Sequence, residues 1–408
     1  MANLILHNEL TVEDKILRMK DDAQYEIAMD REIDSFCTVD LSMLSGIRAK
    51  PGPPTVPKVF VSNDCIFNCA YCGCRSSHDK QRYCSTPAEL AKIALLEAKK
   101  NTHGVFITSA IYKNADYTQE MILKTLKIIR ETYLYSGYLH AKVMPGADPL
   151  LIEQTGRYAN RMSVNIEVAK SEGYDKIAKQ KNRTNILTPM GQISDCIKNA
   201  RQYRGKYAVS QTTQLMAGST GEDDRTIMNL SRALYRKYDL KRVYYTAFQY
   251  KHEAKGYSMP LVSTPKWRVR RLYQADRLLE LYGFTPDEIT PADDPFLSPE
   301  LDPKASYALR NLHLFPVEVN KADYEMLLRV PGIGTTYAQK IMEARKYCVI
   351  THSVLKQMGV SLKRCVYFIT CNGTYNGGTA FDNYDVLRQM TADKQSDGRG
   401  LDQLSFEL

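Results

Sequence analysis

The chain has 408 residues, of which 44% are hydrophobic and 25% are charged. This length predicts two or three domains, and this composition excludes a disordered chain or a fibrous repeat. There is no apolar run of about 18 residues, which excludes a transmembrane helix, and residues 1–20 lack the apolar stretch of a secretory signal. We therefore expect a cytoplasmic protein with no membrane partner. The net charge, 55 − 46 = +9, is modest for this length, so its distribution matters more than its size.

Residues 1–50 are predicted to form a helical leader, which the proline-rich segment 50–57 ends. Strand and helix patterns alternate after it. Six strands joined by helical connections predict a parallel sheet, because a parallel return needs a long crossover. Six units are fewer than a closed eight-stranded barrel needs, so we expect an α/β fold with an open, partial (βα)6 barrel. The strands are expected at 58–61, 104–108, 138–144, 161–167, 207–215 and 242–248, and the helices include 87–100, 118–133, 190–203 and 224–238.

The same patterns suggest a division into five parts. The barrel is expected to span residues 51–285, after the leader 1–50. A segment rich in Pro and Asp follows and is interpreted as a linker or wrapping loop. The remaining boundaries place the linker at 286–315, a compact all-α module at 316–372 and a polar tail at 373–408.

Four of the ten cysteines fall in one short loop after the first strand. Cys65, Cys69 and Cys72 have the spacing C-x3-C-x2-C, and three such thiolates can hold three irons of a [4Fe–4S] cluster. The fourth iron then has no protein ligand and is open to a cofactor. The alternative is a zinc site, with Cys74 or His78 as a fourth ligand.

The C-x3-C-x2-C motif, placed after the first strand of a βα barrel and with Tyr71 before the last cysteine, resembles the radical S-adenosylmethionine (SAM) superfamily. The resemblance implies a partial radical SAM barrel in which the amino and carboxylate groups of SAM bind the open iron. It also implies that one electron cleaves SAM to methionine and a 5′-deoxyadenosyl radical, which abstracts hydrogen from a substrate. The protein positions this chemistry, and the cofactor carries it out.

Polar residues near the ends of the later strands are candidates for holding SAM. Along 161–167 the alternation of a strand places Ser163, Asn165 and Glu167 on one face, away from three apolar residues. The Asn-x-Glu pair is similar to the residues that contact the SAM ribose in biotin-synthase-like members, with a structural hydrogen-bond network as the alternative. His140 and Lys142 share an inner face. His140 is interpreted equally well as a core histidine, and Lys142 is expected to pair with Glu167 or to contact the SAM carboxylate or a substrate phosphate.

The resemblance extends to three further positions. Ser109 ends the second strand, where the superfamily has small residues that receive the SAM amino group. Arg183 is a candidate partner of the SAM carboxylate, or a surface arginine. Gln214 lies on the strand before a Gly-containing turn, which resembles the stretch near adenine. The cofactor-binding candidates are thus Tyr71, Ser109, Lys142, Asn165, Glu167, Arg183 and Gln214, and no side chain is assigned to hydrogen transfer itself.

Most of the net charge lies in residues 241–272, which hold eight Lys or Arg and one acid, 8 − 1 = +7, interleaved with aromatic residues. Cations among aromatics suit the phosphates and unstacked bases of nucleic acid. The alternative is a sixth strand followed by a solvated helix face. The candidates for phosphate contact are Lys266, Arg268, Arg270 and Arg271.

Residues 319–341 predict two helices joined by the turn Pro-Gly-Ile-Gly. This pattern is similar to the helix-hairpin-helix motif of DNA repair proteins. Gly332 and Gly334 allow positive φ and close approach, and the N–H groups at the next helix start, near Thr335, can bind a phosphate. Lys340 adds positive charge. Binding would be to the backbone of the nucleic acid, or the module has a packing or protein-contact role instead.

Taken together, the cysteine motif, the basic segment and the hairpin resemble a bacterial and archaeal family of radical SAM proteins assigned to DNA modification or repair. Its members are often encoded beside a uracil-DNA-glycosylase-like protein. The resemblance covers residues 55–373 and implies DNA as the favoured partner, an electron donor such as flavodoxin or ferredoxin, and a possible glycosylase-like partner. The leader departs from the family, since Cys37 is its single cysteine. A tRNA-modifying radical SAM enzyme and a non-catalytic iron–sulfur protein that binds nucleic acid are the alternatives.

Overall fold

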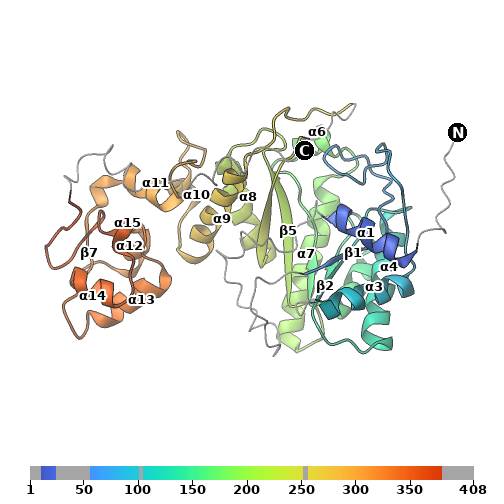
Figure 1. Ribbon diagram of the computed structural model, residues 1–408, viewed down its shortest axis with the longest axis horizontal. Coiled ribbons are helices and arrows are strands. Elements are labelled where there is room, and N and C mark those ends of the chain that lie inside the picture. The colour runs from blue at the N-terminus through green and yellow to red at the C-terminus, as the bar shows by residue number, and fades with distance from the viewer. Residues whose placement is uncertain (1–10, 24–55, 101–103, 251–255, 379–408) are drawn as a thin grey trace. The chain divides into compact units, whose positions relative to one another are not determined.

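The computed structural model describes residues 11–23, 56–100, 104–250 and 256–378 (Figure 1). The chain forms two compact units. The first contains residues 1–222 and 233–264, and the second contains residues 223–232 and 265–408. Cys37, most of the predicted leader and most of the predicted tail lie outside the described residues.

The first unit is built on a six-stranded sheet in which every neighbouring pair is parallel and the strands follow chain order. This confirms the predicted partial barrel of six parallel strands. Gln211 of the fifth strand faces the covering helices, because its side-chain amide donates to the Met190 and Tyr238 carbonyls. The strands are β1 (Lys58–Phe60), β2 (Val105–Thr108), β3 (Leu139–Lys142), β4 (Arg161–Ser163), β5 (Ser210–Ala217) and β6 (Arg242–Ala247).

The helices of this unit follow the predicted pattern, because their apolar residues recur on one face. Helix α3 buries Leu90, Ile93 and Ala94 against the sheet. Helix α4 begins after Asn114, whose side chain accepts from the Tyr117 N–H, and it continues into a π-helical turn, η2. The bounds are α1 (Val12–Ala23), α3 (Pro87–Lys100), α4 (Ala115–Lys127), η2 (Ile128–Thr132), α5 (Pro149–Tyr158), α6 (Glu172–Ile177) and α7 (Arg183–Tyr203). Helix α8 (Asp224–Tyr238) has its first residues in the second unit and its last residues in the first.

Strand β4 is shorter than predicted, and this changes which way its continuation points. It pairs with β5 up to Ser163–Thr212, breaks, and returns in a single bridge between Glu167 and Leu215. Four residues on one strand therefore match three on the other, which is a β-bulge. The Thr213 hydroxyl fills the break, since it accepts from the Ile166 N–H at 2.9 Å and donates to the Val164 carbonyl at 2.7 Å. The predicted alternation across 161–167 is therefore wrong beyond Ser163.

The second unit is mainly helical. It contains two helices, α10 and α11, inside the segment expected to be a linker. The expectation of an all-α module is wrong in one detail, because β7 and β8 form a short parallel pair between Val317–Glu318 and Ile369–Thr370. The bounds are α9 (Lys266–Leu281), α10 (Pro286–Ile289), α11 (Pro303–Arg310), η3 (Leu312–Leu314), β7 (Val317–Glu318), α12 (Tyr324–Arg329), α13 (Thr335–Ala344), α14 (His352–Gln357), α15 (Leu362–Cys365) and β8 (Ile369–Thr370).

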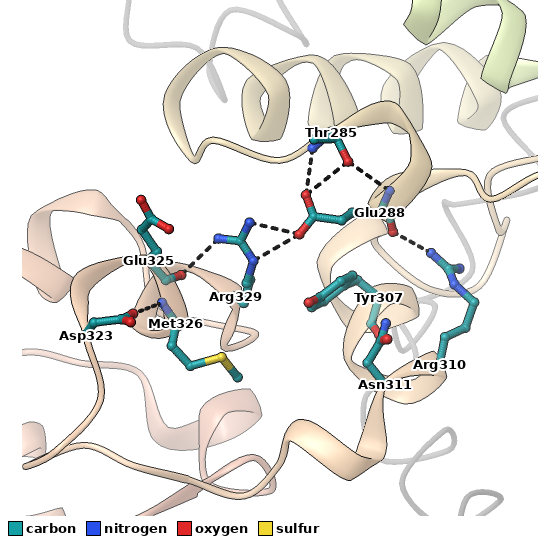
Figure 2. A network of polar contacts seen from close by, with 9 residues as sticks. All are labelled: Thr285, Glu288, Tyr307, Arg310, Asn311, Asp323, Glu325, Met326 and Arg329. Atoms are coloured by element: carbon teal, nitrogen blue, oxygen red, sulfur yellow. Dashed lines mark hydrogen bonds and ion pairs between the residues drawn. The ribbon is translucent and has the colours of Figure 1, made fainter.

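A polar network joins α10 to α11 and α12 (Figure 2). Glu288 forms a capping box with Thr285 at the start of α10, and its carboxylate also accepts from the Arg329 guanidinium of α12 at 2.8 and 3.0 Å. The Arg310 guanidinium of α11 donates to the Glu288 and Ile289 carbonyls at the end of α10. These contacts fix α10 and α11, which lie in the segment expected to be a linker, to the helical module.

In the part of the chain that the structure describes, no helix has the length and apolar character needed to cross a membrane.

Candidate cluster site and nucleic-acid interface

The loop that carries the cysteine motif follows β1 and is held together by one arginine. The guanidinium of Arg82 donates to the carbonyls of Asn63, Cys74, Arg75 and His78, at 2.7 to 2.9 Å. Four carbonyls are thereby satisfied by one side chain, which closes the loop without regular secondary structure. The loop begins at the carboxyl end of β1, the edge where parallel sheets bind their ligands.

The three thiols of the motif differ in their surroundings. Burial raises the pKa of Cys69 to about 12, and burial together with the neighbouring Cys72 raises the pKa of Cys65. The pKa of Cys72 is instead lowered to about 7, because its sulfur accepts hydrogen bonds from the Cys74 thiol and the Cys74 N–H. Metal ligation requires thiolates, so a bound cluster must displace protons from two of these three groups.

The three cysteines of the motif act on one another electrostatically. Among the described residues, no three His, Cys, Asp or Glu side chains lie close enough together to hold one metal ion. The thiolates of an iron–sulfur cube each bind a different iron and stand further apart. Cys65, Cys69 and Cys72 are still near enough to shift one another's pKa, as three corners of one cluster would be.

A buried ion pair lies beside the cysteine loop. The ammonium of Lys181 is 2.9 Å from the Glu167 carboxylate and 3.1 Å from the Tyr71 hydroxyl. Burial alone would lower the pKa of Lys181, but Glu167, Tyr71 and Cys69 outweigh it, so the pKa is raised well above its ordinary value. Burial raises the pKa of Tyr71, and the Glu167 carboxylate raises it further. The structure thus brings Tyr71, Glu167 and the cysteines together.

Lys181 is the residue that the sequence prediction missed. The prediction offered Lys142 as a partner for Glu167 and Arg183 as the cation after the fourth strand, whereas the ion pair that the structure shows is made by Lys181. Arg183 is exposed as the first residue of α7. Nothing in the spacing singles out Lys181 among its neighbours Lys179 and Arg183, since its role depends on how the loop before α7 folds.

The other predicted cofactor residues lie on or after the strands. Ser109 follows β2, is half-buried, and its hydroxyl donates to the Ser62 carbonyl at 3.4 Å. Gln214 of β5 and Lys142 of β3 are buried, and Asn165 is half-buried within the bulge. Glu167 has a left-handed backbone, φ 62°, fixed by its N–H to the Gln214 carbonyl and its carbonyl to the Met216 N–H. The bulge therefore aims this carboxylate toward Lys181.

The four predicted phosphate contacts in α9 have different environments. Arg271 is buried, and its guanidinium donates to the Ser298 and Pro299 carbonyls and to the Gln274 side chain. Arg268 forms an ion pair with the buried Asp224 at 2.7 Å. These two arginines serve the structure of the second unit. Lys266 and Arg270 are exposed.

The Pro-Gly-Ile-Gly turn joins α12 to α13. Gly332 has φ 86°, as expected for a position that favours glycine. Gly334 does not, because its φ is −99°; it is close-packed instead, since a Cβ there would lie 3.1 Å from the Tyr282 hydroxyl. That hydroxyl accepts from the Thr335 N–H, the first of α13. Lys340 is exposed on α13.

A buried lysine lies behind the turn. The Lys304 ammonium group donates to the carbonyls of Val330 and Ile333, at 3.1 and 2.5 Å, and it lies 4.6 Å from the centre of the Tyr282 ring. Burial lowers the pKa of Lys304 to about 7, against the opposing charge of Asp302. The protein therefore occupies the carbonyl side of the turn with Lys304, and the Tyr282 hydroxyl accepts from the Thr335 N–H at the start of α13.

A family model of the helix-hairpin-helix motif matches residues 316–349. No curated protein sequence matches the chain. Among solved structures, the chain is similar to HydG, a maturase of the [FeFe]-hydrogenase, at 13% identity and a TM-score of 0.44, covering 67% of this chain and 62% of that one. It is also similar to methylornithine synthase, PylB, at 14% identity and a TM-score of 0.38, covering 59% of this chain and 65% of that one. A third similar structure is the radical SAM methyltransferase TsrM from Kitasatospora setae, at 10% identity and a TM-score of 0.35, covering 48% of this chain and 38% of that one. The chain thus spans less than two thirds of the HydG chain.

Proposed function

We propose that the protein is a radical SAM enzyme that modifies or repairs a nucleic acid, with DNA as the favoured substrate. One observation carries the proposal: Cys65, Cys69 and Cys72 lie in a loop at the carboxyl edge of a six-stranded parallel sheet, beside the buried Glu167–Lys181 pair. Ligands bind at this edge of parallel sheets. A helical hairpin of the kind that binds nucleic acid follows in the same chain.

In this proposal each residue near the loop has a defined part. Cys65, Cys69 and Cys72 hold the [4Fe–4S] cluster. When bound, the cluster and SAM supply a one-electron cleavage that yields a radical able to abstract hydrogen. Lys181 positions the carboxylate of Glu167 toward the bound cofactor through their ion pair. Asn165 with Glu167 is proposed for the ribose, Ser109 for the amino group, and Tyr71, Lys142, Arg183 and Gln214 for the remaining contacts.

The hairpin is proposed to hold the nucleic acid through its backbone. We propose that a phosphate binds near Gly332, Gly334 and Thr335, replacing the Tyr282 hydroxyl at the Thr335 N–H, and that Lys340 adds charge. Lys266 and Arg270 are the exposed cations of α9 that we retain for phosphate contact, whereas Arg268 and Arg271 are not retained. The target nucleotide must leave its stack to reach the cluster. The electron donor is proposed to be a flavodoxin or ferredoxin, and a uracil-DNA-glycosylase-like protein is a proposed partner.

The cluster part is tested by anaerobic reconstitution of the full chain, iron analysis and electron paramagnetic resonance. We expect about four irons per chain and reductive cleavage of SAM to 5′-deoxyadenosine. Cys65→Ala, Cys69→Ala and Cys72→Ala should each abolish cleavage, whereas Cys348→Ala, which changes an exposed thiol of the second unit, should not. Bound zinc, or a cluster without SAM cleavage, would contradict the proposal, and the latter would favour the non-catalytic alternative.

The nucleic-acid part is tested by binding of duplex DNA, single-stranded DNA and tRNA at matched salt. Lys266→Gln, Arg270→Gln and Lys340→Gln should each weaken binding and lower the salt dependence by about one phosphate contact. Arg271→Gln should lower stability instead, because it leaves buried carbonyls without donors. Anaerobic incubation with SAM and the bound nucleic acid, followed by nucleoside mass spectrometry, identifies the product. Preferred binding and modification of tRNA would replace DNA as the substrate.

A further inference from the structure

Basic side chains gather on the inner face of the six-stranded sheet, the face that points away from the helices. Gln211 of β5 faces helices α7 and α8, so its neighbour Thr212 faces the opposite, inner side. The strand register places Lys142, Ser163, Thr212 and Arg242 in one row across β3, β4, β5 and β6 on that inner side. The row has a base at each end and two hydroxyls between them.

A second row lies directly below. His140 of β3 is in register with Arg161 of β4, and both lie on the same face as the first row. The two rows are two residues apart along each strand, so the bases of the two rows lie on neighbouring positions of one face. The six strands of the sheet contain no Asp or Glu at all. Four bases thus gather on a face whose strand residues include no acid.

Three polar atoms in these two rows have no hydrogen-bond partner among the described residues. They are Nε2 of His140, Oγ of Ser163 and Oγ1 of Thr212, in side chains that are 3%, 4% and 0% exposed. Buried polar groups are nearly always hydrogen-bonded, and each exception calls for an explanation. The unpartnered atoms come from three adjacent strands and lie among the four bases, so one ligand can satisfy all of them.

We propose that this face binds the phosphate group of a phosphate monoester, held by His140, Lys142, Arg161, Ser163, Thr212 and Arg242. A monoester carries about two negative charges and three terminal oxygens near neutral pH, which suits several cations and three unpartnered groups. A carboxylate has one charge and two oxygens, too few for the three unpartnered atoms. Arg161 is already oriented for this role, since its guanidinium bonds Ser210 at 3.0 Å and lies 5.8 Å from the Tyr138 ring centre.

The site deepens the proposed function and rests on it in one respect, that the phosphate belongs to the substrate. The level of Thr212 lies three residues before Leu215, which pairs with Glu167. At about 3.3 Å per residue, the phosphate would be about 10 Å along the strands from the level of that carboxylate. One nucleotide spans a distance of this order. The monoester is therefore either a free nucleotide or the phosphorylated end of a strand.

The test is calorimetric titration of the full, anaerobically reconstituted chain with thymidine 5′-monophosphate, thymidine and inorganic phosphate. We expect the monophosphate to bind at least about tenfold more tightly than thymidine, because charge-assisted hydrogen bonds are lost with the phosphate. Inorganic phosphate should compete. Equal binding of the monophosphate and thymidine, or no binding of either phosphate, would overturn the inference.

Two conservative variants localise the site. Ser163→Ala and Thr212→Val should each weaken monophosphate binding by about tenfold or more. Neither should lower the thermal stability of the ligand-free protein, because each removes a buried hydroxyl that has no described partner. Ser194→Ala is the matched control: its hydroxyl on α7 is also buried and unpartnered, but it lies on a covering helix. Unchanged binding in both inner-face variants would overturn the inference.

Two further arms separate the sources and the dependence on the proposed function. Competition by a 5′-phosphorylated oligonucleotide, but not by its 5′-hydroxyl form, identifies a strand end; competition by neither identifies a free nucleotide. The Cys65→Ala variant should still bind the monophosphate while failing to cleave SAM. SAM cleavage in the native chain without monophosphate binding would overturn this inference and leave the proposed function in place. Monophosphate binding by a native chain that does not cleave SAM would overturn the proposed function and leave the phosphate site in place.

Discussion

The ammonium group of Lys181 lies within hydrogen-bonding distance of both the Glu167 carboxylate and the hydroxyl of Tyr71, the residue before the third cysteine of the motif. One cation therefore links the loop after β1 to the bulge after β4. Both charged side chains are largely buried, at 12% and 7% exposed.

Lys181→Met should destabilise the first unit by about 3 kcal/mol, because it leaves the Glu167 carboxylate buried without its partner. Glu167→Gln in the same chain should restore much of this loss. Hydrogen exchange of the β5 amides, with and without each change, measures the effect. If the single and double variants were equally stable, the ion pair would have no role in fixing the carboxylate.

Cys74→Ala should raise the pKa of Cys72 from about 7 toward its ordinary value, because the variant removes the thiol that donates to Cys72 and keeps only the backbone N–H. The thiolate fraction of Cys72 near pH 7.5 then falls. Alkylation of cluster-free protein by iodoacetamide, followed by peptide mass spectrometry, should show several-fold slower modification of Cys72. Cys348→Ala serves as the control, and an unchanged rate in Cys74→Ala would assign the lowered pKa to another group.

The stability of the second unit should depend on pH through Lys304. Its pKa is about 7 in the folded chain against an ordinary value of 10.5, so the unfolded chain holds the proton more tightly. This contribution to stability is fully present above pH 10.5 and is lost as the pH falls through 7, with a slope of at most about 1.4 kcal/mol per pH unit. Urea unfolding followed by the fluorescence of Trp267, the single tryptophan, measures it between pH 7 and 9.

Lys304→Met should remove that part of the pH dependence, whereas Lys340→Met, which changes an exposed lysine of the same unit, should keep it. If Lys304→Met and the native chain showed the same pH dependence of stability, the lysine would be charged in both the folded and the unfolded chain.

Gly332→Ala should destabilise the hairpin by about 1–2 kcal/mol, because alanine is strained at φ 86°. Its Cβ would also lie 3.3 Å from the Cys365 nitrogen. Gly332→Asn should cost less, since asparagine tolerates this conformation better. Trp267 fluorescence during urea unfolding compares the three proteins, and DNA binding should follow the same order. Equal stability of the alanine variant and the native chain would show that the turn relaxes to another conformation.

The sequence predicted those parts of the fold that depend on repeating local patterns. Helices α3 and α8 have the predicted bounds, and all six strands lie within or close to their predicted ranges, because apolar periodicity is a local signal. No local pattern in the sequence indicates the bulge between Ser163 and Glu167, because the bulge depends on the Thr213 hydroxyl of the neighbouring strand.

Side-chain partners were less predictable than elements. Arg268 and Arg271 look like surface cations in the sequence, yet their partners are the distant Asp224, Ser298 and Pro299. Lys181 was missed for the same reason, because a buried ion pair is defined by tertiary contacts. Helix periodicity can show that a position is buried, but it does not show which acid or carbonyl meets it.

The Thr213 hydroxyl bonds both the Ile166 N–H and the Val164 carbonyl. Valine at position 213 would have the same shape but neither a donor nor an acceptor. The Ile166 N–H and the Val164 carbonyl would then be buried without these hydrogen bonds. The direction in which Glu167 points thus depends on the side chain of Thr213, which lies on the next strand of the sheet. A designer who wished to redirect that carboxylate would begin at position 213 and leave position 167 untouched.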